Sequence, residues 1–467
     1  DLHSFPTRRS SDLAEGKKEY SANEIPTRLS QIWNHNTSYH AFLTHRYNLG
    51  FYKEKQDSVD TDSVKITQVF VPVTSFIHTL QVDLNNRKYI SYDDAQNQKY
   101  FEHNYLGTDS IDKTKRTSIK NTIGIALQEG FNKWAKAGLT AFLSYEYRNF
   151  ALTDTTNIPG QRIINNYKES SLSIGGELSK KQGKLLHYNI LGELAIAGED
   201  AGQFSVEGRG DLNLRLFGDT VRLDVNAFIK NQNPVFYFRH FQSKHYWWDN
   251  NDLSKIMRTR LEGKLSLDRW GTQLRAGVEN IKNYTYLANT SIPVKDSEGN
   301  VTGFKNNAAV RQHSGNIQIF TAMLQQKLKV GIFHLDGEVA YQKSSEQDIL
   351  PLPELSAYGN LYMKFGLAKK VLQIEMGADV RYFSKYYAPD YSPVIGQFYN
   401  QNPDDKIEIG AFPIVNVYAN LHLKRTRFFI MMYHVNAGSG KSNYFLAPHY
   451  PINPRMIKFG LSWNFFD

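Results

Sequence analysis

Two long runs of alternating apolar and polar residues, joined by a tight turn, constrain the fold of this chain most. In the first run, 204–216, apolar residues and glycines occupy every second position, and polar or charged residues fill the positions between them. Gly218-Asp219 offers the residue types of a tight hairpin turn, and the run 221–229 then repeats the alternation. Successive side chains of a strand point to opposite faces, so each predicted strand has one apolar and one charged face.

The length of the alternating runs indicates where such strands reside. Strands of soluble proteins average about 5–6 residues, which is shorter than the runs seen here. A tilted strand that crosses a bilayer needs about 9–11 residues. The pattern therefore predicts an all-β fold: a transmembrane, antiparallel, up-and-down β-barrel with its apolar face toward lipid and its charged face toward an aqueous lumen.

Composition removes several other classes of protein. The chain has 467 residues and a mean hydropathy of −0.50. It contains no apolar run of about 18 residues, which excludes a helical membrane protein. This test does not exclude a β-barrel, because half of the residues in each barrel strand are polar. The absence of cysteine excludes disulfides and thiolate metal sites. The net charge is +9, but basic and acidic residues alternate along strands, so no nucleic-acid partner is expected.

The first residues do not enter the fold prediction. Residues 1–13 read DLHSFPTRRSSDL and resemble the translation of a sequencing adapter more than a natural leader. If an adapter adjoins Ala14, the native N-terminus lies upstream, and the missing signal peptide does not bear on location. Residues 14–38 are polar and receive no assignment, and residues 39–467 are predicted to form an N-terminally truncated barrel.

The alternation recurs along the chain and predicts about seventeen strands. They cover 41–51, 73–84, 119–127, 135–147, 172–178, 186–196, 204–216, 221–229, 257–267, 274–278, 317–328, 333–341, 357–365, 372–382, 415–423, 428–432 and 457–465. A charged linker is expected around 53–63 and a polar loop at 91–115. If the last strand ends on the periplasmic side, the first one descends from outside. At least one more strand is then expected upstream, which would give eighteen or more in the intact protein.

The connections between these strands alternate in length. Most short turns are followed by long loops, at 150–167, 231–254, 284–312, 386–412 and 436–454, with a short link near Gly198 as the exception. Outer-membrane barrels have short periplasmic turns and longer extracellular loops. A soluble sandwich has no reason to segregate loop lengths in this way.

Motifs that could carry chemistry are weak. Gly440-Lys441-Ser442 lacks the earlier glycine of a phosphate-binding loop, because Val435 stands at that position. The segment 246–252, YWWDNND, could form a sugar or calcium site, but an ordinary Asn/Asp-rich turn is favoured. The histidines show no zinc-binding spacing. We therefore expect no enzyme activity, no catalytic residue, no cofactor and no metal.

The charged strand faces are the candidate site. An Arg or Lys on the lipid face would cost about 2–4 kcal/mol at the bilayer midplane, so these residues are expected to line the lumen and tune selectivity. The alternative is that the charges only neutralise one another in a closed lumen. The candidates are Glu207, Arg209, Asp211, Arg215, Arg222, Asp224, Arg258, Arg260, Glu262, Lys264, Arg275, Glu279, Glu375, Asp379 and Arg381.

The closing stretch, 456–466, resembles the aromatic terminal strand that the barrel-assembly machinery recognises in bacterial outer-membrane proteins. The residues that carry this likeness are Phe459, Leu461, Trp463, Phe465 and Phe466. Together with the segments 39–51 and 245–250, the chain resembles the putative porin family of Bacteroidota outer membranes. One departure is the extra Asp467 after the terminal aromatic residues. The resemblance implies an outer-membrane channel and offers no catalytic residues.

The expected function is therefore that of a porin, surrounded by outer-membrane lipid, that passes small polar or charged solutes passively. It could form a homo-oligomer. One alternative is a plugged barrel whose surface loops bind or adhere, and a less favoured one is a barrel that hydrolyses lipid.

Overall fold

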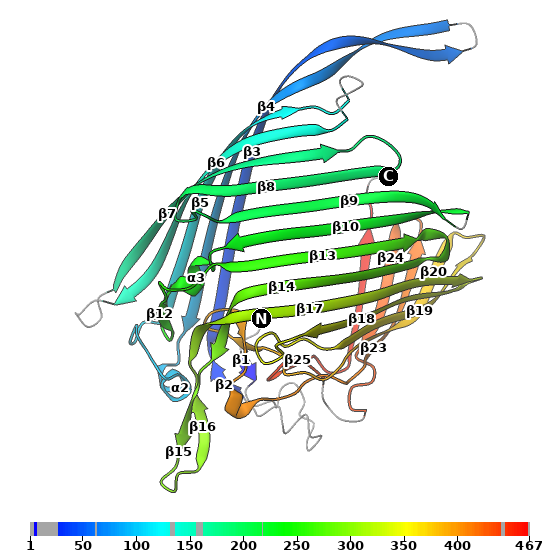
Figure 1. Ribbon diagram of the computed structural model, residues 1–467. Coiled ribbons are helices and arrows are strands. Elements are labelled where there is room, and N and C mark those ends of the chain that lie inside the picture. The colour runs from blue at the N-terminus through cyan, green and yellow to red at the C-terminus, as the bar shows by residue number, and fades with distance from the viewer. Residues whose placement is uncertain are drawn as a thin grey trace.

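The computed structural model describes residues 4–6, 27–60, 63–130, 136–155, 162–216, 218–439 and 444–465. Its main feature is a closed barrel of 17 strands (Figure 1). The predicted fold class and strand number are confirmed. No helix among the described residues is long and apolar enough to cross a membrane.

Long strands form the barrel wall. They are β3 (Ile32–Asp60), β4 (Ser63–Ser91), β5 (Ile111–Leu127), β6 (Gly138–Thr155), β7 (Arg162–Lys180), β8 (Leu186–Gly198), β9 (Phe204–Leu216), β10 (Asp219–Gln232), β13 (Ile256–Leu267), β14 (Thr272–Asn289), β17 (Ala308–Val330), β18 (Phe333–Ser344), β19 (Leu355–Leu367), β20 (Leu372–Phe383), β23 (Ile414–Leu423), β24 (Thr426–Tyr433) and β27 (Met456–Trp463).

Short elements lie outside the wall. They are β1 (Ser4–Pro6), β2 (Thr27–Ser30), α2 (Asp94–Tyr100), α3 (Phe236–Arg239), β11 (His240–Gln242), β12 (Trp247–Asp249), η1 (Asp268–Trp270), β15 (Ile292–Lys295), β16 (Val301–Lys305), β21 (Asp390–Ser392), β22 (Gln397–Tyr399), η2 (Pro403–Asp405), β25 (Phe445–Ala447) and β26 (Tyr450–Pro451).

Each barrel strand pairs antiparallel with the next one along the chain. The predicted central hairpin is β9 and β10, paired from Phe204↔Asn231 to Asp219↔Leu216. The ring closes where β27 lies beside β3. Because the number of strands is odd, these two neighbours run in the same direction.

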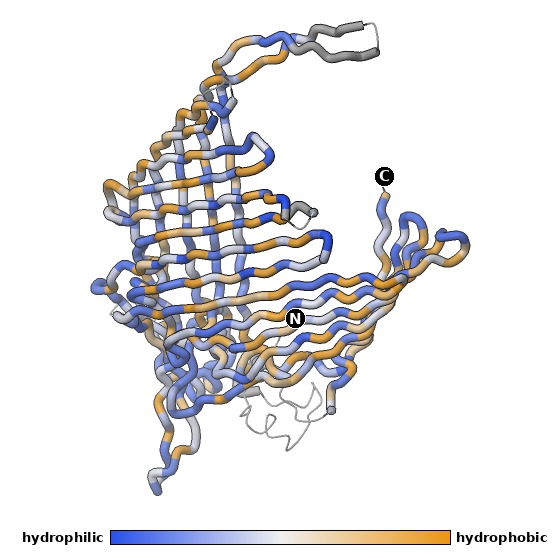
Figure 2. Tube along the Cα trace, turned by 45° about the vertical axis from the view of Figure 1, so that its right-hand side comes forward, coloured by the Kyte–Doolittle hydropathy of each residue, from blue (hydrophilic) through white to orange (hydrophobic). Residues whose placement is uncertain are grey.

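The two faces of the wall differ in polarity, as the alternation predicts. Register places Leu261 opposite Val278, and Val278 opposite Phe320, so that apolar residues form rows across neighbouring strands. These side chains remain exposed, Leu261 by 54% and Val278 by 53%, because they face away from the barrel interior. Figure 2 shows the resulting alternation of hydrophobic and hydrophilic positions along the strands. The apolar rows form the lipid-facing band.

Two segments differ from the sequence-based expectation. The stretch 53–63 was expected to be a charged linker, but its residues 53–60 continue β3 and its residue 63 begins β4, and these two strands project beyond the ring (Figure 1). Cross-strand backbone pairing does not require alternating polarity, so the charged sequence misled the prediction. The stretch 91–115, expected to be a loop, contains α2 and the start of β5. The side chain of Asp93 caps α2 by accepting a hydrogen bond from the backbone N–H of Gln96.

The main hydrophobic core is made by the connections and strand ends at the long-loop end, not by the middle of the barrel. It joins segments far apart in the sequence, including Phe101, Tyr246, Trp248, Val394 and Tyr399, all at most 8% exposed. Figure 1 shows α2, α3 and β12 gathered at this end. We call this packed assembly the loop plug. Several long loops therefore fold together, whereas the β15–β16 hairpin projects beyond this assembly (Figure 1).

Candidate functional site

Ion pairs cross the polar face of the wall between β9 and β14. Lys230 Nζ lies 2.6 Å from Glu207 Oε1, and Lys264 Nζ lies 3.0 Å from Asp224 Oδ2. Asp224 and Lys264 are directly opposite in the register of β10 and β13. Candidates predicted from alternation alone are thus brought into contact by strand pairing. The other ion pairs of this part of the wall are Arg222–Asp224, Arg258–Glu279, Arg260–Glu262 and Arg275–Glu262.

In the pairs that involve arginine, the two members differ in exposure. The Arg222 side chain is 53% exposed and its partner Asp224 is 14% exposed. The Arg258 side chain is 45% exposed and its partner Glu279 is 12% exposed. The carboxylates therefore lie close to the wall, whereas the guanidinium groups extend away from it. The accessible surface of this face is more basic than its composition indicates.

The remaining candidates are distributed around the ring rather than gathered. Asp211 contacts His187 with an Oδ2–Nδ1 distance of 2.8 Å, and Arg209 lies opposite Asn226 in the register. Arg215 pairs with Thr220 near the β9–β10 turn. The last three candidates lie on β20: Glu375 is 3.6 Å from Lys364 Nζ, Asp379 accepts a 2.9 Å hydrogen bond from Asn416, and Arg381 lies over the Tyr358 ring.

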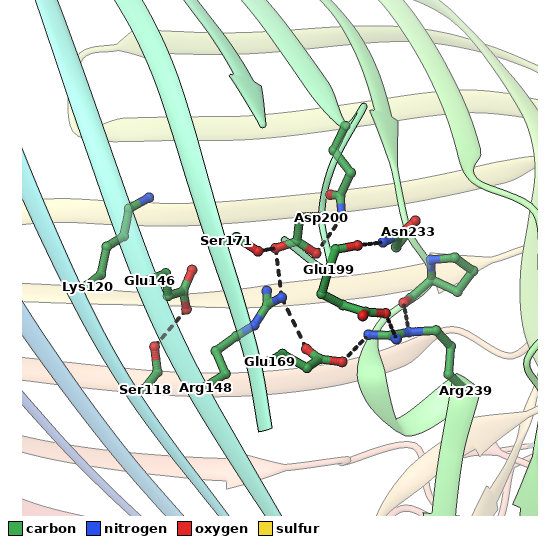
Figure 3. Close-up of polar contacts among 12 residues, drawn as sticks. Ser118, Lys120, Glu146, Arg148, Glu169, Ser171, Glu199, Asp200, Asn233 and Arg239 are labelled. Carbon is green, nitrogen blue, oxygen red and sulfur yellow. Dashed lines mark hydrogen bonds and ion pairs between the residues drawn. The ribbon is translucent and has the colours of Figure 1, made fainter. Parts of the chain in front are cut away.

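A second charged cluster connects the wall to the loop plug (Figure 3). Arg148 of β6 and Glu169 of β7 are opposite in register, with Arg148 Nη2 3.1 Å from Glu169 Oε2. The same guanidinium lies 2.7 Å from Asp200 Oδ2, in the β8–β9 turn. Arg239 of α3 lies 2.7 Å from Glu169 and 2.8 Å from Glu199. The cluster therefore attaches the 233–255 loop to the wall.

The sequence analysis did not identify this cluster. Arg148 continues the polar positions of the predicted strand 135–147, whereas Glu169 lies three residues before the predicted strand 172–178, because β7 is longer than predicted. Arg239 lies in a long connection without alternation, so no local pattern indicates its partners. Only the folding of the loop against the wall brings it to Glu169.

The centre of the 233–255 loop is buried. Lys244 is 0% exposed, and its Nζ donates to Asp94 Oδ1 at 3.0 Å and to the carbonyl oxygen of Asp109 at 2.6 Å. His245 stacks on Phe101 with ring centroids 3.8 Å apart. Its Nδ1 donates to the carbonyl oxygen of His103 at 2.8 Å. Burial lowers the pKa of His245 to about 3, so the ring is neutral at physiological pH.

The segment 246–252 is not an open aromatic platform. Tyr246 is 1% and Trp248 is 8% exposed, and both belong to the plug core, whereas Trp247 is 49% exposed. Nor is the segment an ordinary turn, because it contains β12, which pairs with β11 upstream of the segment. In the described part of the chain, no three His, Asp or Glu side chains are arranged to hold a metal ion.

The terminal strand carries its aromatic residues on the lipid-facing side. Phe459 is 82%, Leu461 57% and Trp463 58% exposed, and Phe465, just beyond β27, is 73% exposed. Phe466 and the segment 440–443 lie outside the described residues.

Comparisons with known proteins agree with this geometry. Residues 5–467 match the family described as putative porin. No curated protein matches. Among solved structures, the chain is similar to a mutant ferric enterobactin receptor from Pseudomonas aeruginosa, with 13% identity, a TM-score of 0.56, and coverage of 92% of this chain and 62% of that one.

Two further structures are similar at the level of fold. The siderophore receptor PirA from Acinetobacter baumannii has 8% identity and a TM-score of 0.55, with coverage of 84% of this chain and 63% of that one. The FrpB iron transporter from Neisseria meningitidis has 11% identity and a TM-score of 0.53, with coverage of 95% and 74%. This chain thus spans less than two thirds of the first two structures.

These likenesses show the fold and the location, a β-barrel of the bacterial outer membrane. With a family match that covers nearly all of its residues and a wall that has the polarity of a membrane barrel, the chain belongs to the putative porin family.

Proposed function

We propose that this protein passes small polar or charged solutes passively through the barrel lumen. The observation that carries the proposal is the exposure of Arg222 and Arg258, about half of each side chain, on the polar face of the wall. Side chains that filled a closed interior would be buried against one another. A barrel of this strand number is also too wide to be filled by side chains alone, so its middle holds water.

The loop plug narrows the path of the solute at the long-loop end of the barrel. Solute must pass between the plug and the wall, where a cavity of about 300 Å³ lies between them. Aromatic residues of the 233–255 loop, including Tyr237 and Trp248, line one side of it, and Asn36, Asn85 and Arg87 of the wall line the other. The opening is thus narrowed by packed side chains, with aromatic rings on the plug side and polar groups on the wall side, which favours small solutes.

A second function is favoured by the plug itself. A core that includes Phe101, Tyr246 and Trp248 is packed like a small domain, which a permanently open channel does not need. The similar solved structures are named as siderophore receptors and as an iron transporter. In this alternative the plug keeps the barrel closed, and the surface loops bind a ligand.

Single-channel recording separates the two functions. The full-length protein is refolded, its folding is verified by heat-modifiable gel mobility, and it is inserted into a planar bilayer. Steady current steps that scale with salt concentration support the porin function. Folded protein that inserts and stays silent over the voltage range would contradict it and favour the closed barrel.

A further inference from the structure

The short-turn rim of the barrel is basic. Apart from the β3–β4 hairpin, which carries both signs, the described turns at this end and their flanking residues contain three acidic residues, Glu129, Asp219 and Asp268, and a larger set of basic ones: Lys136, Lys181, Lys184, Arg269, Lys369, Lys370, Lys424 and Arg425. The long connections have the opposite balance, with acidic residues in excess. The barrel is therefore polarised along its axis, and its short-turn mouth attracts anions.

Part of this rim forms a cavity. A space of about 370 Å³ lies where the β19–β20 and β23–β24 turns adjoin. Lys370 and Lys424 line it from the two turns, and Lys364 and His422 line it from the strands. Register places His422 opposite Gln373, which also lines the cavity. Five nitrogen-bearing side chains, from three strands and two turns, thus border one space.

Backbone conformation places the two turn lysines. Lys370 has φ +69° and Lys424 has φ +52°, both in the left-handed region that non-glycine residues seldom adopt. Gly366 leaves room for Lys370, because a Cβ on Gly366 would lie 3.1 Å from Lys370 Cγ. The side chain of Lys370 therefore folds back over the end of β19. A glycine at this position permits the approach, and a larger residue would displace the lysine.

The charge of the cavity is not balanced by protein groups. Glu375 is the carboxylate that lines it, and its Oε2 lies 3.6 Å from Lys364 Nζ. Within the described residues, neither Lys370 nor Lys424 forms an ion pair.

We propose that this cavity, which we call the basic mouth, binds small anions that carry phosphate or carboxylate groups and makes the barrel prefer anionic solutes. The inference rests on the proposed function and deepens it by naming the charge of the solute. Ammonium groups bind phosphate as point charges, and a neighbouring imidazole N–H can donate a hydrogen bond. The exposed guanidinium groups of Arg222 and Arg258 continue the same preference along the wall.

The same chemistry could bind a lipid headgroup instead of a free solute. His422 and Gln373 lie on the polar face of β23 and β20, opposite to the lipid-facing rows, so the cavity opens toward the lumen. We therefore assign it to a soluble anion. The experiment includes a lipid arm to separate the two sources.

The first arm measures binding without requiring a current. Inorganic phosphate binding to the refolded protein in uncharged detergent is measured by equilibrium dialysis. We expect the double variant Lys370→Gln/Lys424→Gln to bind about tenfold more weakly. Lys369→Gln, a lysine of the same turn that does not line the cavity, is the matched control and should bind nearly as wild type. Equal binding by all three proteins would overturn the proposal.

The second arm measures selectivity. In a potassium chloride gradient, wild type should give an anion-selective reversal potential, and the double variant should shift it toward cations. Gly366→Ala, which keeps all charges but displaces Lys370, should weaken phosphate binding as well. If the bilayer stays silent but the substitutions weaken phosphate binding as expected, the channel function is refuted and the binding site is supported. If current flows but the substitutions change neither phosphate binding nor ion selectivity, the binding site is refuted and the channel function is supported.

The lipid arm compares vesicles of phosphatidylcholine with vesicles that contain phosphatidylglycerol. Phosphate binding that is unchanged between them supports a soluble anion. Weaker phosphate binding in the vesicles that contain phosphatidylglycerol would mean that the lipid headgroup occupies the site, and would overturn the assignment to a soluble anion.

Discussion

Arg239 should hold the 233–255 loop against the wall, and its replacement tests how the plug is attached. Its guanidinium, 13% exposed, contacts Glu169, which is 7% exposed, and Glu199, which is 45% exposed. In Arg239→Gln, Glu169 keeps one partner, Arg148 at 3.1 Å. Breaking a buried pair completely costs about 3–5 kcal/mol, so the remaining contact places the cost at about 2–3 kcal/mol. The exposed Glu199 pair contributes less than about 1 kcal/mol.

Such a cost changes the docking of the loop rather than the integrity of the barrel. About 2–3 kcal/mol corresponds to a 30- to 150-fold larger population of undocked loop, since 1.4 kcal/mol is a factor of ten. Limited chymotrypsin digestion of the folded protein, followed by mass spectrometry, measures this population. We expect cleavage within 233–255 to accelerate by that factor, because aromatic residues such as Tyr237 and Tyr246 become accessible.

Glu199→Gln is the matched control, because it removes a contact of the same arginine at its exposed side. Its cleavage rate should stay within about fivefold of wild type. Heat-modifiable gel mobility should be unchanged in both variants. If Arg239→Gln and Glu199→Gln are cleaved alike, burial does not decide the strength of these ion pairs and the reasoning is refuted.

Three further predictions concern pH, selectivity and the membrane face. Burial lowers the pKa of His245 to about 3, below the 6.5 of an exposed histidine, so plug docking is fully favoured above pH 6.5 and weakens by about 1.4 kcal/mol per unit as pH falls toward 3. Chymotrypsin cleavage of the 233–255 loop should rise accordingly between pH 6 and pH 4.5, and His245→Asn should remove this rise; a pH-independent rate in wild type would contradict the assignment. Arg260→Glu reverses a charge on the polar face, and the reversal potential in a salt gradient should move toward cations, whereas an unchanged potential would place Arg260 off the solute route. Phe459→Arg puts a charge on the lipid-facing side of β27 and should lower the free energy of folding into vesicles by about 2–4 kcal/mol in a urea titration, while Ser462→Arg on the opposite face should lower it much less.

The alternation of residues was sufficient to predict the wall. A side-chain period of two leaves only one arrangement in which Arg209, Asp211 and Asp224 avoid lipid, so the polar face, the strand number and the order of short and long connections follow from local patterns. The hairpin of β9 and β10 was predicted because the alternation and its turn residues agree. The extension of β3 through residues 53–60, paired with β4 from Ser63 onward, was missed because its polarity does not alternate, although its backbone still pairs.

The loop plug and the two charged clusters were decided by tertiary structure alone. The attachment of Arg239 to Glu169, the burial of Lys244 beside Asp94, and the placing of Lys370 and Lys424 at one cavity each join residues that are far apart in the sequence, at least one of them in a connection. Loops have no periodic constraint, so their sequence does not encode which wall strand they meet. The residue pattern of a membrane strand is set by lipid on one face and water on the other, so it can be recognised in the sequence. The conformation of a loop depends on contacts with residues that only the closed barrel brings close to it.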